Sequence, residues 1–293
     1  MEWQDIISQF EKFLKKKGRS NSTIIAYIQD IKQLSAYSQG QKLNSPKIIS
    51  KTDLENYIAG LNKQGLFTTK TISRKINSLK TFFKFLLSIS YISTNPSLTI
   101  RHPQTEPLIP KTITTNEYRA LRDCARTNRK IYTMIELLLQ TGIRIGELSR
   151  LRQRDFTKNS EGKYILHIEK FSTIPSRDIE LNHIIVACLQ EYQLLVPNIP
   201  NNKEGFLFFT KTGRIMLIRN IRTALDRVFQ KANIKNATVN DLRNTFIIYQ
   251  LENCMKIEKL AEIVGHRKIT TTKRYLEFAN ITDKKQITKI TAL

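Results

Sequence analysis

Apolar residues recur at helical spacing through most of the first hundred residues. In residues 3–18 they fall every three or four positions, and Gly18 follows as a stop signal. Three later segments show similar patterns, with Ser or Thr capping residues or a terminal glycine: 20–38, 52–65 and 70–87. We therefore predict a helical first domain over residues 1–100.

The last of these segments divides into an apolar face and a basic, polar face. The second face carries no acidic residue and consists of Lys70, Arg74, Asn77, Thr81 and Lys84. A charged helix face usually meets solvent, but one without acidic members also suits contact with a phosphate backbone. Both interpretations stay open, and Lys70, Arg74 and Lys84 are candidate DNA contacts.

A proline-rich stretch, "RHPQTEPLIPK" at residues 101–111, is typical of an extended linker between domains. The chain after it, residues 112–293, mixes helical patterns with a short strand pair in 163–181, where apolar and polar positions alternate. We predict a mainly α fold with a small β element: an N-terminal helical domain followed by an α+β domain.

The charge balance indicates a polyanionic partner. Lys and Arg number 48 against 25 Asp and Glu, a formal charge of +23, so nucleic acid ranks first and an anionic membrane second. Both parts are basic, with 17 against 7 up to Lys111 and 31 against 18 afterwards, as expected for a two-part clamp around DNA. No apolar run could span a bilayer and the N-terminus does not resemble a signal peptide, so we expect a cytoplasmic protein without a membrane partner.

Metal and disulfide chemistry find little support in the sequence. The cysteines, Cys124, Cys188 and Cys254, are scattered and include no CxxC pair. The four histidines do not cluster with acidic residues at the spacing of metal ligands. We expect neither a structural metal nor a cofactor.

Three stretches carry the candidate chemistry: "TGIRIGELSRLRQRDF", the strand pair, and "TVNDLRNTF" together with "IVGHRKITTTKRYLEF". They resemble the tyrosine recombinase family, which includes phage-type integrases and the Xer proteins, and residues 1–100 resemble that family's helical, SAM-like core-binding domain. The resemblance implies a catalytic set of two arginines, a hairpin lysine, a late histidine and a tyrosine nucleophile. These roles match Arg144, Arg243, Lys170, His266 and Tyr275, and Asn240 stands where the family usually has histidine or lysine.

Elementary chemistry agrees with this assignment. Attack on a phosphodiester builds negative charge on a phosphorane, which forked guanidiniums stabilise well. Thr238 and Asp241 predict a capped helix start that places Asn240 and Arg243 in its first turn. A tyrosine with a pKa near 10 needs cations or a proton acceptor nearby, and the amide of Asn240 cannot take a proton.

The predicted hairpin contains candidates for the proton donor and for a DNA contact. The resemblance implies that Lys170 protonates the departing 5′ oxygen, and neighbouring Lys163 is the alternative for this role. Arg177, on the returning strand, is a further candidate DNA contact.

The function implied is site-specific DNA recombination through a 3′-phosphotyrosyl bond and a Holliday junction, by a tetramer on two DNA sites. Resolution of dimers or cointegrates and integration of a mobile element are equally compatible with it. The rivals are a type IB topoisomerase and a DNA-binding protein on a decayed recombinase scaffold. Residues 283–293 are either a docking segment for a neighbouring protomer or a frayed tail.

Overall fold

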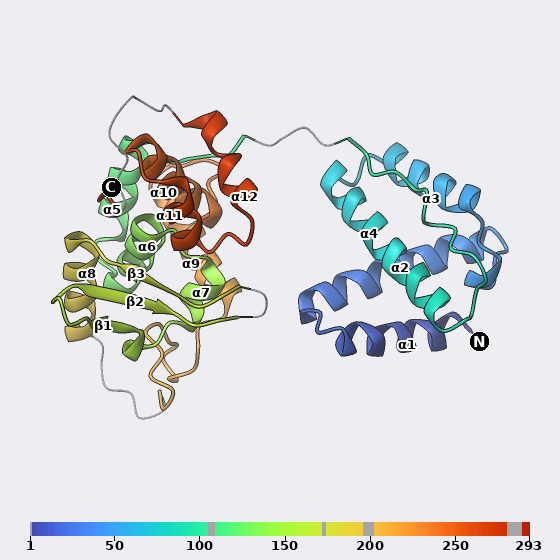
Figure 1. Ribbon diagram of the computed structural model, residues 1–293, viewed down its shortest axis with the longest axis horizontal. Helices are drawn as coiled ribbons and strands as arrows, with labels where there is room; N and C mark the ends of the chain where they lie inside the picture. Colours follow the sequence, from blue (N-terminus) through green and yellow to red (C-terminus); the bar gives the residue numbers. More distant parts are fainter. Residues whose placement is uncertain (1, 105–108, 172–173, 196–201, 280–288) are drawn as a thin grey trace. The chain divides into compact units, whose positions relative to one another are not determined.

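The chain forms two compact units, Met1–Pro107 and Leu108–Leu293 (Figure 1). Each unit has its own hydrophobic core. The computed structural model describes residues 2–104, 109–171, 174–195, 202–279 and 289–293. The predicted linker spans the division between the units, and its central residues lie outside the described ranges.

Within residues 2–104, four α-helices build the first unit, as the apolar periodicity predicts. They are α1 (Trp3–Lys16), α2 (Asn21–Gly40), α3 (Lys51–Lys63) and α4 (Thr69–Ser88), with a 3-10 turn η1 (Pro46–Ile48) before α3. The side chain of Ser20 caps α2 by accepting from the Thr23 amide at 3.2 Å. Aromatic rings of α1 and α4 fill the core, where Phe10 and Phe82 meet edge to face with centroids 5.2 Å apart.

The polar face of α4 has an acidic partner on another helix. Asp30 of α2 is 2% exposed and pairs with the guanidinium of Arg74 and with Lys75 Nζ, the latter at 3.0 Å. Lys70 and Lys84 are exposed, and within the described ranges neither forms an ion pair. The basic face predicted from the sequence is therefore open at Lys70 and Lys84, whereas the charge of Arg74 is partly compensated by Asp30.

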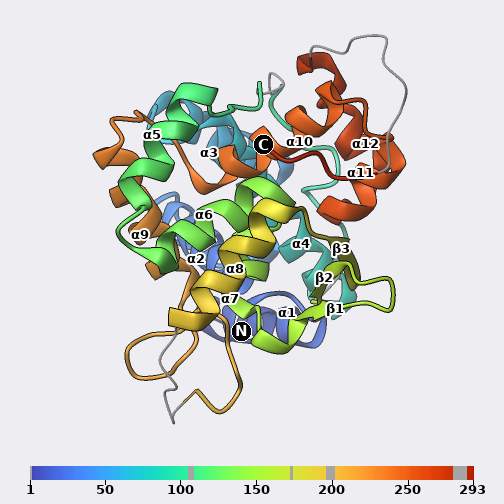
Figure 2. The same ribbon diagram turned by 90° about the vertical axis from the view of Figure 1, so that its left-hand side faces the viewer.

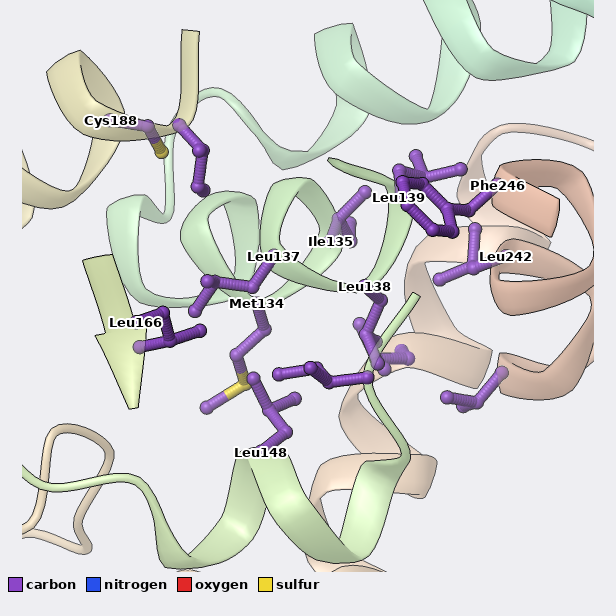
Figure 3. Packing of buried hydrophobic residues seen from close by; sticks show 14 of the residues in the cluster. Met134, Ile135, Leu137, Leu138, Leu139, Leu148, Leu166, Cys188, Leu242 and Phe246 are labelled. Atoms are coloured by element: carbon purple, nitrogen blue, oxygen red, sulfur yellow. The ribbon is translucent and has the colours of Figure 1, made fainter. Parts of the chain in front are cut away.

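The second unit surrounds a central helix, α6, with helices and a small sheet. Its helices are α5 (Thr115–Ala125), α6 (Arg129–Thr141), α7 (Ile145–Arg150), α8 (His183–Leu195), α9 (Ile218–Lys231), α10 (Val239–Glu252), α11 (Ile257–Val264) and α12 (Ile269–Lys273), with 3-10 turns η2 (Gln153–Asp155) and η3 (Leu276–Phe278). Consecutive buried side chains of α6 meet residues from α7, α8, α10 and the sheet (Figure 3). Figure 2 shows α8 running alongside α6.

The sheet has three antiparallel strands in the order β1 (Phe156–Lys158), β2 (Tyr164–Ile168) and β3 (Arg177–Glu180). The predicted strand pair is β2 and β3, in the register Ile168↔Arg177 and Leu166↔Ile179. The sequence did not predict β1, because three residues are too few to show an alternating pattern. In the part of the chain that is described, no helix is long and apolar enough to cross a membrane.

Candidate active site

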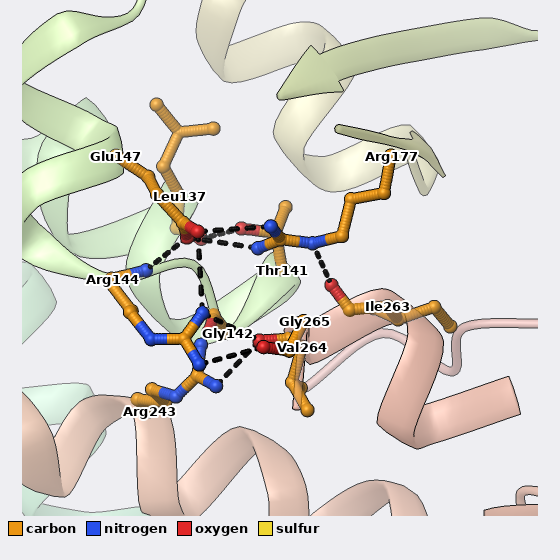
Figure 4. Close-up of polar contacts among 10 residues, drawn as sticks. All are labelled: Leu137, Thr141, Gly142, Arg144, Glu147, Arg177, Arg243, Ile263, Val264 and Gly265. Atoms are coloured by element: carbon orange, nitrogen blue, oxygen red, sulfur yellow. Dashed lines mark hydrogen bonds and ion pairs between the residues drawn. The ribbon is translucent and has the colours of Figure 1, made fainter. Parts of the chain in front are cut away.

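The C-terminal end of α11 is the centre of the candidate site. Its last carbonyl groups have no partner within the helix, and Gly265 ends it with φ +65°. Arg144 donates from Nη1 to the Val264 carbonyl at 3.1 Å and from Nη2 to the Gly265 carbonyl at 2.8 Å (Figure 4). The negative end of the helix dipole thus attracts a guanidinium before any substrate is bound.

Arg144 owes its position to the start of α7. It is the residue before the helix, in an extended conformation, and its backbone N–H donates to Glu147 Oε2 at 2.8 Å. Arg144 thus stands at the N-cap position, one residue before the first turn of α7. About a third of its side chain is exposed, so the guanidinium can be reached by a ligand.

Arg243 approaches the same carbonyl groups from α10. Its guanidinium donates to the carbonyl of Gly142, at the end of α6, and to that of Val264, the latter at 2.6 Å. Burial lowers the pKa of Arg243, and the charge of Arg144 lowers it further. Arg243 forms no ion pair with any described residue, and an arginine in this situation beside another arginine is well prepared to bind an anion.

Arg177 is a third arginine at this helix end, and it is buried in the protein interior. Its Nε donates to the Ile263 carbonyl at 2.6 Å, and its two Nη atoms each donate to a Glu147 oxygen at 2.9 Å. In the DNA-free structure its side chain is 3% exposed and is occupied by these partners, and a contact of Arg177 with DNA stays a prediction. Its fork holds Glu147, which in turn orients Arg144.

Tyr275 lies between α12 and η3, with its phenol half-buried against the core. Its hydroxyl donates to Asn244 Oδ1 at 2.9 Å. Burial raises the pKa of Tyr275, while the charges of Arg243, Arg274 and Arg144 oppose that rise. The arginines therefore already act on the phenol electrostatically, as nucleophilic attack requires.

His266 follows Gly265 directly and lies beside Tyr275. The two ring centroids are 6.3 Å apart, and His266 Nδ1 is 2.9 Å from the hydroxyl of the buried Thr272. Burial, followed by the charge of Arg243, lowers the pKa of His266 to about 4. A neutral imidazole at physiological pH can accept a proton or donate a hydrogen bond.

Asn240 is the second residue of α10, one turn before Arg243. The helix start is held as predicted, since the Thr238 amide donates to Asp241 Oδ2 at 2.7 Å. Among the described residues the exposed Asn240 side chain has no hydrogen-bond partner, and it lines an open cavity of about 570 Å³. Its amide is thus available to a ligand at a helix N-terminus.

The two hairpin lysines differ in their surroundings. Lys163 pairs with Glu161 at 2.8 Å and with Glu180 at 3.7 Å. Lys170 is exposed two residues after the end of β2, and it forms no ion pair or hydrogen bond with any described residue. Next to it, Phe171 packs under the guanidinium of Arg150, 3.6 Å from the ring centroid. The hairpin turn at residues 172–173 lies outside the described ranges.

The structure thus gathers Arg144, Arg243, His266 and Tyr275 around one helix end. It leaves Asn240 and Lys170 at the surface, without contacts to that group. Sequence reasoning missed Glu147 and Asn244. The spacing of Glu147, three residues after Arg144, was a readable signal of a helix cap, whereas the role of Asn244 has no sequence signal beyond its place next to Arg243. No group of three or more metal-ligating side chains occurs within the described ranges.

Comparison with known proteins identifies the class. The model of the phage integrase family matches residues 111–280, and the phage integrase N-terminal SAM-like domain matches residues 7–88. Tyrosine recombinase XerC of Staphylococcus carnosus is 28% identical over 269 residues, covering 89% of this chain and 88% of its own. Tyrosine recombinase XerD of Staphylococcus saprophyticus is 28% identical over 297 residues, covering 97% of this chain and 96% of its own.

The fold agrees with the crystal structure of a lambda integrase tetramer bound to a Holliday junction. The TM-score is 0.76 at 16% sequence identity, over 99% of this chain and 80% of the other. The chain belongs to the phage integrase family, because the catalytic model matches more than half of it. The resemblance to tyrosine recombinases, the mainly α fold and the enzyme class of site-specific recombinase are thereby confirmed.

Proposed function

We propose that this chain cleaves and rejoins double-stranded DNA at a specific site through a covalent 3′-phosphotyrosyl bond to Tyr275. The observation that carries the proposal is the grouping of Arg144, Arg243 and His266 around one half-buried phenol. Two guanidiniums beside a nucleophile supply what in-line displacement at phosphorus needs, namely positioning and charge stabilisation.

In the proposed reaction the scissile phosphate replaces some of the backbone carbonyl groups to which the two arginines donate hydrogen bonds. Arg144 and Arg243 bind its non-bridging oxygens, and the amide of Asn240 donates to one of them. The Tyr275 oxygen forms a bond to phosphorus as the bond to the 5′ oxygen breaks. Lys170 protonates that oxygen, while His266 or water accepts the phenolic proton.

The second half of the reaction reverses the first. The 5′ hydroxyl of a partner strand attacks phosphorus, the phosphotyrosyl bond breaks and the phenol regains its proton. Because one phosphodiester is exchanged for another through the protein linkage, the cycle needs no ATP and no metal. Asn240 supplies a hydrogen bond but no proton transfer, so general-base help to Tyr275 rests on His266 or water.

We further propose a tetramer on two DNA sites, acting on DNA in the cytoplasm. A lambda integrase tetramer bound to a Holliday junction has the same fold. The two basic units would clamp the duplex, with the exposed Lys70 and Lys84 on phosphates and Arg74 contributing less because Asp30 compensates its charge. The biological outcome would be resolution of dimers or cointegrates, or movement of an element.

The test is covalent trapping on DNA that the protein itself selects. A bound sequence is enriched from a random pool, rebuilt with a nick next to the scissile phosphate, and incubated with the full chain. We expect a denaturant-resistant protein–DNA band that maps to Tyr275 and disappears in Tyr275→Phe, which should bind the same DNA. Specific binding with no band in the parent protein would contradict the enzyme.

Two other functions have distinct signatures. Relaxation of a supercoiled plasmid that lacks the selected site would favour a type IB topoisomerase. A DNA-binding protein on a recombinase scaffold is suggested only by Asn240, and it predicts binding that loses affinity steeply with salt but never forms the covalent band.

A further inference from the structure

We propose that Asn244 is a positioning residue that holds Tyr275 in a protonated resting position. Its carboxamide lies between the nucleophile and the start of the catalytic unit. Oδ1 accepts from the Tyr275 hydroxyl at 2.9 Å, and Nδ2 donates to the Lys111 carbonyl at 3.1 Å. The inference rests on the proposed function, because it assigns a resting state to the proposed nucleophile.

The polarity of this chain of hydrogen bonds is fixed by its far end. A backbone carbonyl can only accept, so the amide nitrogen of Asn244 must face Lys111 and the amide oxygen must face Tyr275. An amide oxygen only accepts, so the phenol must be the donor. The arrangement is therefore satisfied by a neutral phenol and is repulsive toward a phenolate.

The segment around Lys111, whose carbonyl accepts from Asn244, is itself fixed by several hydrogen bonds. Lys111 Nζ donates to the carbonyls of Lys235 and Asn236, each at 3.0 Å. Two residues later, the Ile113 amide donates to the hydroxyl of Thr245 at 2.8 Å. The segment that opens the catalytic unit is thus fixed along α10, and the acceptor offered to Tyr275 cannot simply follow the phenol as it moves.

Attack on phosphorus needs the phenolic proton to leave, and an amide oxygen is not a base near neutral pH. The hydrogen bond to Asn244 must therefore break before or during attack. Asn244 restrains the nucleophile in the free enzyme, and its removal should ease ionisation of Tyr275. Loss of one such hydrogen bond corresponds to an effect of about threefold to tenfold.

Nitration tests this restraint without requiring activity. Tetranitromethane reacts with phenolates, so the rate at which the Tyr275 peptide is nitrated, measured by mass spectrometry at pH 8, reports its ionisation. We expect Asn244→Leu to raise this rate by about threefold to tenfold, and Asn244→Asp to lower it, because a carboxylate favours the neutral phenol. The buried Tyr192, whose hydroxyl donates to the Leu207 carbonyl, is the internal reference.

Asn253→Leu is the matched control. Asn253 is another half-buried amide, at the end of the same helix, and it donates to the Tyr249 carbonyl at 2.8 Å. Its removal should leave nitration of Tyr275 unchanged. Opposite effects of Leu and Asp at position 244 are not expected from a merely structural disturbance of α10.

The same variants are then compared in single-turnover cleavage of the nicked DNA, at saturating protein. We expect Asn244→Leu to form the covalent band faster than the parent protein, and Asn244→Asp to form it more slowly. If Asn244→Leu is nitrated no faster, or cleaves more slowly while the parent cleaves, the inference is wrong. If the parent forms no Tyr275-dependent band, the proposed function fails, and nitration alone still decides what Asn244 does.

Discussion

Gly265 and Arg177 approach each other so closely that only glycine fits between α11 and the arginine cluster. A β-carbon at position 265 would lie 2.8 Å from Arg177 Nη1, 2.9 Å from its Cζ and 3.2 Å from Arg144 Nη1. The backbone there also has φ +65°, which residues other than glycine rarely adopt. The glycine at position 265 thus allows the end of α11, the arginine cluster and His266 to come together.

Gly265→Ala should therefore damage the site more than its small volume suggests. The added methyl group pushes the guanidiniums of Arg177 and Arg144 away from the carbonyls they bind, and the positive φ becomes strained. We expect cleavage of the nicked DNA to fall by at least about 100-fold, because small misplacements of catalytic groups have effects of that size. DNA binding should change far less.

The matched control is Gly205→Ala. Gly205 also has a positive φ of +68°, but nothing lies within 4 Å of where its β-carbon would stand. It should show the backbone strain without the loss of cleavage. Equal loss in both variants would mean that strain, and not the clash with the arginines, is responsible.

The Arg177–Glu147 pair should carry stability as well as orientation. Arg177→Met leaves the Glu147 carboxylate, which is 2% exposed, with Arg144 as its remaining ion-pair partner among the described residues, and this costs about 3–5 kcal/mol. Removing both charges in Arg177→Met/Glu147→Leu should restore part of that loss while leaving Arg144 misplaced and cleavage impaired. Arg154→Met, which breaks an exposed pair with Glu169, should cost less than about 1 kcal/mol.

The unfolding of the second structural unit, which holds these variants, must be measured separately from that of the first. The single tryptophan, Trp3, lies in the first unit, so its fluorescence reports unfolding there and should not change. Hydrogen exchange of peptides from α6 and α10 reports the second unit. A double variant no more stable than Arg177→Met would contradict a coupled pair.

The sequence predicted more of the fold than of the arginine network. Apolar periodicity placed the four helices of the first unit because each buries a continuous stripe. It could not show that Asp30 lies against Arg74, since the two residues are 44 positions apart in the sequence and lie on different helices. The absence of acidic residues on one helix face says nothing about the charges that a neighbouring helix brings.

The burial of Arg177 was indicated by the alternation of its strand, but arginine is a residue type usually expected at the surface. It shares its strand face with Ile179, which is completely buried, so strict alternation already pointed the arginine inward. An arginine is seldom buried without a partner, and the partner, Glu147, comes from a distant helix. Motif matching located the reactive groups, but the contacts that orient them depend on tertiary structure.

The depressed pKa of His266 predicts a pH dependence of stability. The folded protein keeps this imidazole neutral down to about pH 4, whereas in the unfolded chain it takes up a proton near pH 6.5. Between these values the unfolded chain binds more protons, so stability is full above about pH 7 and falls as the pH is lowered toward 4. His266→Gln should lack this component.

The two proteins are compared by urea unfolding without DNA. The urea midpoint is measured by far-ultraviolet circular dichroism at steps from pH 4.5 to 7.5. The parent protein and His266→Gln should run in parallel above pH 7, and the parent should lose stability relative to His266→Gln as the pH falls. Parallel behaviour over the whole range would show that His266 is not held neutral by its surroundings.

The role of Lys170 can be separated from that of Lys163 by changing the leaving group. If Lys170 protonates the departing 5′ oxygen, Lys170→Met should slow cleavage of ordinary nicked DNA by about 100-fold or more. A 5′-bridging sulfur leaves as a thiolate, whose conjugate acid has a pKa of about 8.5, so it needs little protonation. DNA with that sulfur should restore cleavage by Lys170→Met nearly to the parent rate.

Lys163→Met is the control, because its ammonium is held by Glu161 and Glu180 and should not reach the phosphate. It should cleave both substrates at the parent rate. Rescue by sulfur in Lys163→Met but not in Lys170→Met would reverse the assignment. Slow cleavage of both substrates by Lys170→Met would instead indicate that this lysine positions the DNA, since changing the leaving group cannot replace a lost contact.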